Sequence, residues 1–108
     1  MKLFSVPIAV NINAIHDTIV KTIKAQFLLY KDDYKYLIKI YNEDNIYSAI
    51  SDIYFNDKDK SFYAPVSGIN GQILRMLEYG GVQTKAHKLL SKVSRIISRK
   101  VNGESYVF

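Results

Sequence analysis

Apolar residues recur at helical spacing in the first third of the chain. From Ala14 to Tyr41 they fall within roughly 140° of one another at about 100° per residue, which predicts one apolar stripe on a long helix. Unbroken, this helix would run for about 40 Å. Asn11 or Asn13 stands before it as a candidate N-cap. The stripe consists of Ile15, Ile19, Ile23, Phe27, Tyr30, Tyr34, Leu37, Ile38 and Tyr41.

The end of this stripe admits a second interpretation. Tyr34–Tyr41 (YKYLIKIY) is rich in residues that favour strands, and it could form a strand after a turn at residues 31–33. The helix is favoured, because the apolar stripe continues through the charged triplet Lys-Asp-Asp.

Residues 1–12 show a different period. Val6, Ile8 and Val10 alternate with other residues, which predicts an extended arm or a strand. Pro7 favours the edge of a sheet, because proline has no amide to donate to a neighbouring strand.

Two short aromatic runs flank a charged segment in the middle of the chain. Ile53–Phe55 and Phe62–Val66 predict the strands of a hairpin, with the charged residues between them at its tip. Asn42–Asn45 (NEDN) and Ser67–Gly71 (SGING) contain turn-forming residues and are predicted to be loops. Ile73–Tyr79 is predicted to return toward the sheet as a further strand.

The last third of the chain carries the clearest helical pattern. One face is apolar and consists of Ala86, Leu89, Leu90, Val93, Ile96, Ile97 and Val101. Roughly 140° away, cations at three- and four-residue spacing form a basic stripe, which consists of Lys85, Lys88, Lys92, Arg95 and Arg99. Asn102–Gly103 is predicted to end the helix, and Ser105–Phe108 to add a final strand or an apolar tail.

Helix, hairpin, strand and helix in this order predict an α+β fold. A long N-terminal helix and a basic C-terminal helix would pack on a small antiparallel sheet. The chain has 108 residues, no repeat and no linker rich in proline or glycine, so residues 1–108 are expected to form a single domain. Within it, residues 104–108 would be the terminal strand or tail.

Positive charge is concentrated in the last third. The net charge is +5, yet Tyr79–Gly103 alone contains six cations and no acid. Such asymmetry indicates an anionic partner, either nucleic acid or an acidic protein surface. No apolar run approaches the roughly 18 residues of a spanning helix, so no membrane partner is expected. The start, MKLFSVPIAV, lacks a small-residue cleavage site, which favours synthesis in the cytoplasm.

Catalytic and metal-binding patterns are missing from the sequence. There is no cysteine, no glycine-rich phosphate loop and no nucleophile elbow around a serine. The acidic pairs lie in turn-like segments, where charge mainly serves solubility, although clustered carboxylates also occur in metal-dependent nucleases. We therefore expect no enzyme, no cofactor and no metal site.

The two histidines and the aromatic residues are ambiguous. His16 lies on the apolar stripe and is expected to be a partly buried histidine near a helix start, whereas His87 borders the basic stripe and could contact an anion when protonated. Aromatic residues of the hairpin could stack on bases, but aromatic residues in short strands more commonly fill the core. The basic stripe could be a solvated face, a phosphate contact or a docking surface for an acidic subunit.

Residues 46–97 resemble the tail-completion, or head–tail joining, family of long-tailed bacteriophages. Ile46–Ile50 (IYSAI) stands where that family has a Leu-x-x-Ser-Ile-like step, and Arg75–Gly81 (RMLEYGG) contains its Glu-aromatic-Gly core. Ala86–Leu90 (AHKLL) stands at the start of the last helix. The chain departs from the pattern at Gly81, Lys88 and Leu89, where the family has threonine, proline and phenylalanine. The matching motif residues are Glu78, Tyr79, Gly80, Ala86 and Leu90.

The Glu-Tyr-Gly segment also has a physical interpretation of its own. Gly80 and Gly81 would let the chain take a positive φ and turn from a strand into the last helix. The Glu78 carboxylate could accept backbone donors or pair with a cation of a neighbouring subunit. A plain turn with an exposed glutamate is the equal alternative.

The resemblance implies a structural virion protein at the phage neck. It would form a homo-oligomeric ring, a hexamer in this family, between the connector or head-completion protein and the tail tube protein. DNA would pass through its lumen, with a possible phosphate contact from the basic stripe. The alternatives are a small basic nucleic-acid-binding module and a phage-encoded inhibitor of a host protein.

Overall fold

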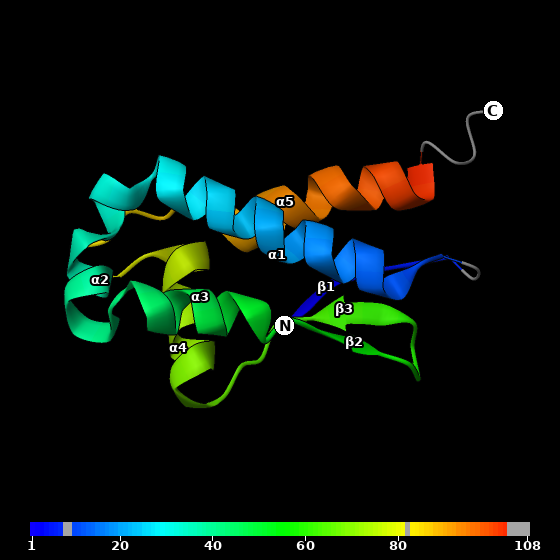
Figure 1. Ribbon diagram of the computed structural model, residues 1–108, viewed down its shortest axis with the longest axis horizontal. Coiled ribbons are helices and arrows are strands. Elements are labelled where there is room, and N and C mark those ends of the chain that lie inside the picture. The colour runs from blue at the N-terminus through cyan, green and yellow to red at the C-terminus, as the bar shows by residue number, and fades with distance from the viewer. Residues whose placement is uncertain (8–9, 82, 104–108) are drawn as a thin grey trace.

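The computed structural model describes residues 1–7, 10–81 and 83–103 and shows an α+β fold (Figure 1). Within these residues, five α-helices pack with one three-stranded antiparallel sheet. The predicted fold class is therefore confirmed. The helices are α1 (Ile12–Leu29), α2 (Lys35–Tyr41), α3 (Glu43–Ser51), α4 (Gly68–Tyr79) and α5 (Leu89–Ser98). A 3-10 turn, η1 (Lys31–Tyr34), links α1 to α2, and a π-helical turn, η2 (Arg99–Gly103), follows α5.

The sheet has the strand order β1-β3-β2, with β1 at Lys2–Ser5, β2 at Tyr54–Asn56 and β3 at Ser61–Tyr63. The predicted hairpin is confirmed, because β2 and β3 pair antiparallel with Phe55 opposite Phe62. The predicted edge strand is also present, although it comes earlier than the alternation suggested, at β1. Phe4 of β1 lies opposite Phe62, and their ring centroids are 5.5 Å apart.

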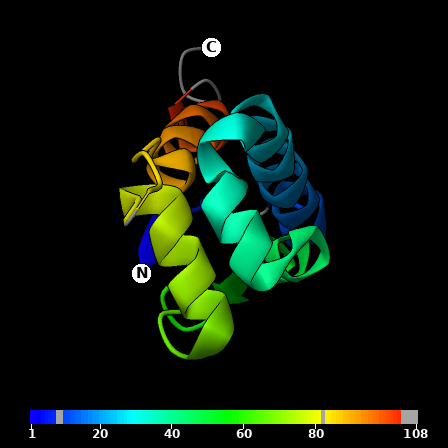
Figure 2. The same cartoon turned by 90° about the vertical axis from the view of Figure 1, so that its left-hand side faces the viewer.

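The core lies between the sheet and the helices. Figure 1 shows α1 and α5 side by side along the long axis, while Figure 2 shows α4 beside α2 at one end of the molecule. The buried members of the predicted stripe on α1 and those of the apolar face of α5 meet in this core. The apolar side chains buried from these two helices are Ile19, Ile23, Phe27, Leu89, Leu90, Val93 and Ile97.

The predicted unbroken first helix is wrong, and so is the alternative strand at residues 34–41. Asn11 caps α1, with its side chain accepting a hydrogen bond from the amide of Ala14, but α1 ends at Leu29. The 3-10 turn then redirects the chain into α2. Tyr34 is fully buried there and donates a hydrogen bond from its hydroxyl to the carbonyl of Leu77 at 3.2 Å. The apolar positions were predicted correctly, but tertiary packing bends the helix that carries them.

The predicted loop at Asn42–Asn45 is instead the start of α3. Asn42 takes a positive φ of 62°, and its side chain accepts from the amide of Asn45 at 3.0 Å. Glu43 and Asp44 follow in the first turn, where negative charge stabilises the helix N-terminus. The polar cluster is therefore a capping signal rather than a loop.

The predicted loop at Ser67–Gly71 and the predicted strand at Ile73–Tyr79 are both wrong, since these residues form α4. Gly68 takes a positive φ of 73° in the first turn. A Cβ on Gly71 would lie 2.4 Å from the carbonyl carbon of Val66, so this glycine permits a close backbone contact. The two glycines suggested a flexible loop, because glycine is common in loops. In this fold they instead allow the start of a closely packed helix.

The C-terminal helical segment ends near the predicted position, since η2 runs to Gly103. The side-chain amide of Asn102 donates to the carbonyl of Ser5 at 2.8 Å and so ties η2 to β1. The predicted strand or tail at Ser105–Phe108, like Ile8 of the predicted arm, lies outside the described residues.

Candidate functional site

The predicted strand-to-helix corner is a corner between two helices. α4 ends at Tyr79, and the amide of Gly80 donates to the carbonyl of Met76 at 2.9 Å. The chain then turns tightly, because Gly81 and Thr84 exchange two backbone hydrogen bonds of 3.0 and 3.1 Å. The amphipathic pattern of α4 places its buried side chains on one helical face, which is the reason that Ile73–Tyr79 does not join the sheet.

Gly80 is the glycine that this corner requires. Its φ is 71°, and a Cβ would lie 2.5 Å from the carbonyl oxygen of Thr84 and 2.8 Å from the amide of Ala86. Both constraints exclude an ordinary side chain. Gly81 does not have a positive φ, and a Cβ there would meet only the end of the Met76 side chain. The predicted role for two glycines therefore belongs mainly to one.

Glu78 holds the start of α5 from the end of α4. It is only 2% exposed, and its carboxylate accepts from the amide of Ser91 at 3.0 Å and from the Ser91 hydroxyl. Its backbone carbonyl also accepts from the amide of Lys88 at 3.1 Å. Lys88 precedes α5 in a left-handed conformation with no side-chain cap, so the carboxylate satisfies an amide that the helix start leaves free. The alternative of an exposed glutamate is wrong.

The remaining motif residues occupy different environments. Leu90 is fully buried on α5, whereas Ala86 is exposed and lies before the helix rather than on its apolar face. Tyr79 is 60% exposed. Thus Glu78, Gly80 and Leu90 build the corner, and Tyr79 is the large motif side chain that faces outward.

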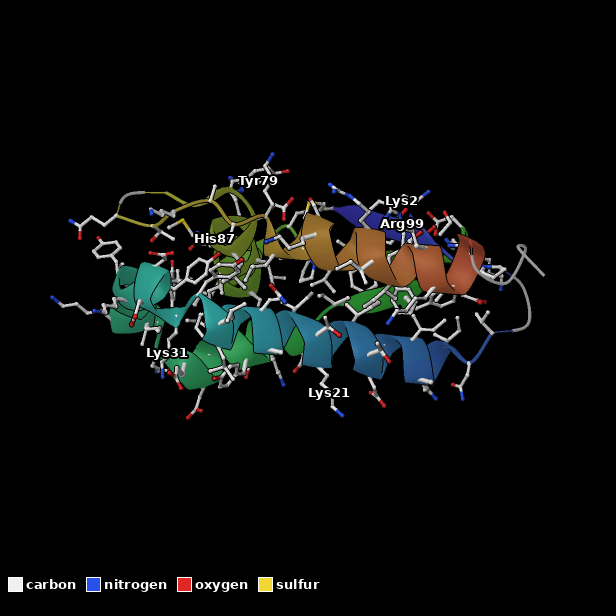
Figure 3. The ribbon with its side chains drawn as sticks, turned by 90° about the horizontal axis from the view of Figure 1, so that it is seen from above. Lys2, Lys21, Lys31, Tyr79, His87 and Arg99 are labelled. Atoms are coloured by element: carbon white, nitrogen blue, oxygen red, sulfur yellow. The ribbon has the colours of Figure 1, made fainter. Side chains whose placement is uncertain are left out.

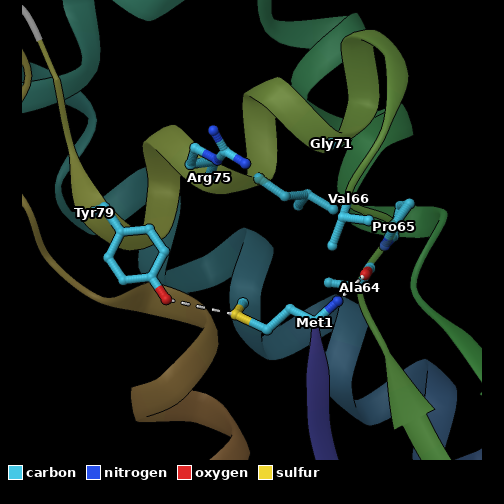
Figure 4. A pocket seen from close by; sticks show the side chains of 8 residues that line it. Met1, Ala64, Pro65, Val66, Gly71, Arg75 and Tyr79 are labelled. Atoms are coloured by element: carbon cyan, nitrogen blue, oxygen red, sulfur yellow. Dashed lines mark hydrogen bonds between the residues drawn. The ribbon is translucent and has the colours of Figure 1, made fainter.

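Tyr79 borders an apolar hollow that sequence reasoning missed. The hollow has a volume of 210 Å³ and lies between the chain start, the segment before α4 and one side of α4 (Figure 4). Val66 is 65% exposed beside it, and Arg75 is the cationic side chain in its lining. We refer to Met1, Val66, Arg75 and Tyr79 as the Tyr79 surface. Val66 and Tyr79 are 13 residues apart in the sequence, and only the fold reveals that they lie together.

The basic stripe is shorter than predicted. Lys85 and Lys88 are exposed but precede α5, so the helix itself carries Lys92 and Arg95, and Arg99 follows at the start of η2. Arg95 and Arg99 are exposed, and no ion pair with either is found within the described residues. Ile96, predicted on the apolar face, is 47% exposed beside them.

Lys92 is engaged inside the molecule together with His87. Its ammonium group lies 5.1 Å from the centre of the Tyr30 ring and 3.4 Å from the Tyr30 hydroxyl oxygen. The ring of His87 stacks on the same Tyr30 ring, with 4.0 Å between the centroids. Its Nε2 lies 2.8 Å from a carboxylate oxygen of Asp33. We call Tyr30, Asp33, His87 and Lys92 the Tyr30 cluster. The anion that His87 contacts in this fold is thus a side chain of the same protein.

His16 occupies the environment predicted for it. Its Nε2 lies 2.6 Å from the carbonyl oxygen of Ile53, which can only accept, so Nε2 carries the proton. Its ring stacks against Phe62 at 6.5 Å between centroids. His16 is therefore a half-buried histidine with a satisfied hydrogen bond, as expected from its place on the stripe.

The two phenylalanines of the hairpin pack into the core, and its two tyrosines lie on the outer side. Phe62 is fully buried and Phe55 is half-buried against it, with ring centroids 5.2 Å apart. On the outer side, Tyr54 stacks on Tyr63 at 5.8 Å. The Tyr63 hydroxyl donates to Asp59, and this hydrogen bond raises the pKa of Tyr63 above its ordinary value. Of these four rings, that of Tyr54 is the most exposed.

Among the described residues, no group of three or more histidine or acidic side chains is placed to hold a metal ion. None of the described helices has the length and apolar character needed to cross a membrane. Comparison of the chain with protein-family models, with curated proteins and with solved structures found no match.

Proposed function

We propose that this protein is a structural, non-enzymatic part of a tailed-phage virion, a tail-completion protein that joins head and tail at the neck as a ring. The observation that carries the proposal is the Tyr79 surface. Val66 and Tyr79 are both at least 60% exposed at the border of one largely apolar hollow. Apolar side chains that gather in this way mark a protein-interaction surface more strongly than scattered ones. In the proposed ring a second copy of the chain covers this surface.

The division of roles within the Glu-Tyr-Gly motif supports this proposal. Glu78 and Gly80 are fixed by contacts inside the protein, and they hold Tyr79 in one position on the surface. Tyrosine is enriched in interfaces, because a large ring covers much area while few torsions become fixed. A motif with two structural residues around an exposed tyrosine suits a contact between subunits.

The cations of α5 and η2 provide a second contact surface. Arg95 and Arg99 are exposed, and Figure 3 shows Arg99 at the same edge of the molecule as Lys2. In the ring this edge faces either an acidic neighbouring subunit or the phosphates of DNA in the lumen. The connector or head-completion protein and the tail tube protein would then bind the two faces of the ring.

Light scattering and negative-stain electron microscopy test the proposal. The purified protein, alone and with the connector and tail tube proteins of its phage, should form ring-shaped particles. The double variant Val66→Ser with Tyr79→Ala should reduce assembly strongly. The matched control is Ile40→Ser with Tyr54→Ala, which removes one exposed aliphatic and one exposed tyrosine side chain elsewhere. A protein that stays monomeric with both partners, or two double variants that assemble equally, would contradict the proposal.

A second candidate function is a small nucleic-acid-binding module. The absence of an ion pair to Arg95 and Arg99 among the described residues favours it, since both charges are available to phosphates. Its affinity for DNA or RNA should fall steeply with salt and be lost in Arg95→Glu with Arg99→Glu. A filter-binding assay at low salt that retains no nucleic acid would eliminate this candidate.

A further inference from the structure

A groove separates β1 from α5 on the cationic edge of the molecule. Its volume is 310 Å³, at the lower end of the roughly 300–1,000 Å³ of ligand sites. One wall is the serine-bearing side of α5, with Ser91, Ser94 and Ser98, and the other is β1 with Lys2. Arg95 also lines it. None of the described residues that line the groove is acidic.

Ser94 is the unusual residue of this groove. It is 5% exposed, and its hydroxyl has no hydrogen-bond partner among the described residues. A serine within a helix often satisfies its hydroxyl with the carbonyl four residues earlier, which Ser94 does not do. A buried hydroxyl without a partner costs free energy. A hydrogen bond from Ser94 to a molecule bound in the groove would remove this cost.

The neighbouring donors lie on the same side of α5. The Ser98 hydroxyl oxygen accepts from the Asn102 amide at 3.3 Å, so its own proton is free to be donated. Ser98 and Ser94 are four residues apart, one helical turn, and therefore project in the same direction. Lys2 from β1 and Arg95 from α5 add positive charge from both walls.

The opposite end of the groove is less suited to an anion. There the Ser91 hydroxyl already donates to the Glu78 carboxylate, which brings a negative charge close to that end. An anion is accordingly favoured one to two turns further along α5, at Ser94 and Ser98. Two hydroxyl donors and two cations around one small space suit a group with several acceptor oxygens.

We propose that the groove between β1 and α5 binds a phosphate group, with Ser94 and Ser98 as hydroxyl donors and Lys2 and Arg95 as counter-ions. The phosphate is either free inorganic phosphate or a phosphodiester of a nucleic acid backbone. The site needs one copy of the chain only. Phosphate binding can therefore be measured on the monomer, and its result does not depend on whether the protein forms a ring.

An NMR titration of the ¹⁵N-labelled full chain tests the site. Inorganic phosphate is added at constant ionic strength, with chloride as the reference salt, and a short oligothymidylate is titrated separately. Phosphate should shift amides of β1 and of the Ser94–Ser98 turn. Competition between the oligonucleotide and phosphate for the same amides identifies nucleic acid as the source, whereas phosphate binding alone identifies the free ion; both results support the site.

Ser94→Ala is the most informative variant, because it removes an unpartnered buried hydroxyl and should leave the protein at least as stable in urea. Its affinity for phosphate should fall about tenfold, the effect of one hydrogen bond to a charged group. Arg95→Gln and Lys2→Gln should weaken binding as well. Lys21→Gln is the matched control, since Lys21 lies on the opposite edge in Figure 3 and is exposed.

Three results would overturn the site. The first is a Ser94→Ala variant that binds phosphate like the original protein, as expected if only water meets this hydroxyl. The second is an equal loss of affinity in Lys21→Gln and Arg95→Gln, as expected for diffuse attraction to a basic protein. The third is an absence of phosphate-specific shifts in β1 and α5.

Discussion

Glu78 joins α4 to α5 by accepting a hydrogen bond from the amide of Ser91 at 3.0 Å while almost fully buried. The pair replaces the side-chain cap that α5 lacks at Lys88. A carboxylate at a helix N-terminus gains from both the free amide and the helix dipole. The same residue that carries the family resemblance thus has a structural role that is sufficient to explain its presence.

Removal of this cap should be costly. Glu78→Ala leaves the amide and hydroxyl of Ser91 without their buried partner, so the free energy of unfolding should fall by about 2–3 kcal/mol. Glu78→Gln retains an acceptor and should lose about 1 kcal/mol. Urea denaturation measures both. Asp17→Ala, at an exposed acid on α1, serves as the control and should change stability by less than about 0.5 kcal/mol. A loss at Glu78→Ala no greater than that of the control would refute the capping role.

The two glycines of the corner should respond unequally to alanine. Gly80→Ala combines a positive φ with backbone atoms closer than 3 Å to the new Cβ, so a loss of about 2 kcal/mol or more is expected. Gly81→Ala meets only the flexible end of Met76 and should lose less than about 1 kcal/mol. Thermal or urea unfolding of the two variants provides the comparison. Equal losses would mean that the positive φ and the close backbone atoms at Gly80 do not restrict this position to glycine.

The contact between Asp33 and His87 should be energetically coupled. The side chains form a hydrogen-bonded pair at 2.8 Å that is buttressed by the Tyr30 ring, and a double-mutant cycle with alanine should give a coupling of about 1 kcal/mol. The pair His16 and Asp17 provides the control, because its atoms are 3.8 Å apart and Asp17 is largely exposed. Its coupling should be close to zero. Similar couplings in both cycles would show that the Asp33–His87 contact does not hold the segment before α5 to η1.

Stability should fall at alkaline pH partly because of Tyr34. Burial, followed by the nearby charges of Asp33 and Glu78, raises the pKa of Tyr34 well above its ordinary value. The folded state therefore keeps this proton at a pH where the unfolded chain loses it. Tyr34 contributes constant stability below about pH 10, and above it stability should decline by up to about 1.4 kcal/mol per pH unit.

Tyr34→Phe separates this contribution from that of other groups. At neutral pH the variant should be less stable by about 1 kcal/mol, because the carbonyl of Leu77 loses its hydroxyl donor. Between pH 10 and higher values the difference from the original protein should shrink and can reverse, since phenylalanine does not ionise. Urea unfolding curves from about pH 7 to pH 11 measure the difference. A difference that stays constant over this range would contradict the raised pKa.

Local patterns predicted the parts of the fold that depend on local physics. The apolar faces of α1 and α5, the Asn11 cap and the β2–β3 hairpin follow from side-chain spacing and turn residues within a short stretch. The bend after α1 does not, because it depends on Tyr34 reaching a carbonyl of α4 that is 43 residues away in sequence. Such long-range packing overrides a periodicity that continues smoothly through the bend.

Glycine and asparagine account for the errors at the two predicted loops. Ser67–Gly71 contains the residues of a flexible loop, yet Gly71 is there because a helix packs against the backbone of Val66. Asn42–Asn45 contains the residues of a turn, and the same residues cap α3. For the candidate site, the importance of Glu78 could be inferred from its neighbours, but its partner Ser91 could not. The Tyr30 cluster and the groove at Ser94 depend on contacts between distant segments, for which no local pattern exists.

The hydrogen bond from Asn102 to Ser5 connects segments 97 residues apart and has a consequence for synthesis on the ribosome. The hairpin and the α3–α4 pair involve nearby segments and can form while translation continues. The outer edge of β1, made first, stays uncovered until α5 and η2, made last, have emerged. A stalled or shortened product would therefore carry an open strand edge and an uncovered α1 face, both of which favour aggregation. In the folded protein α5 and η2 lie against β1, the described element that is synthesised before all the others.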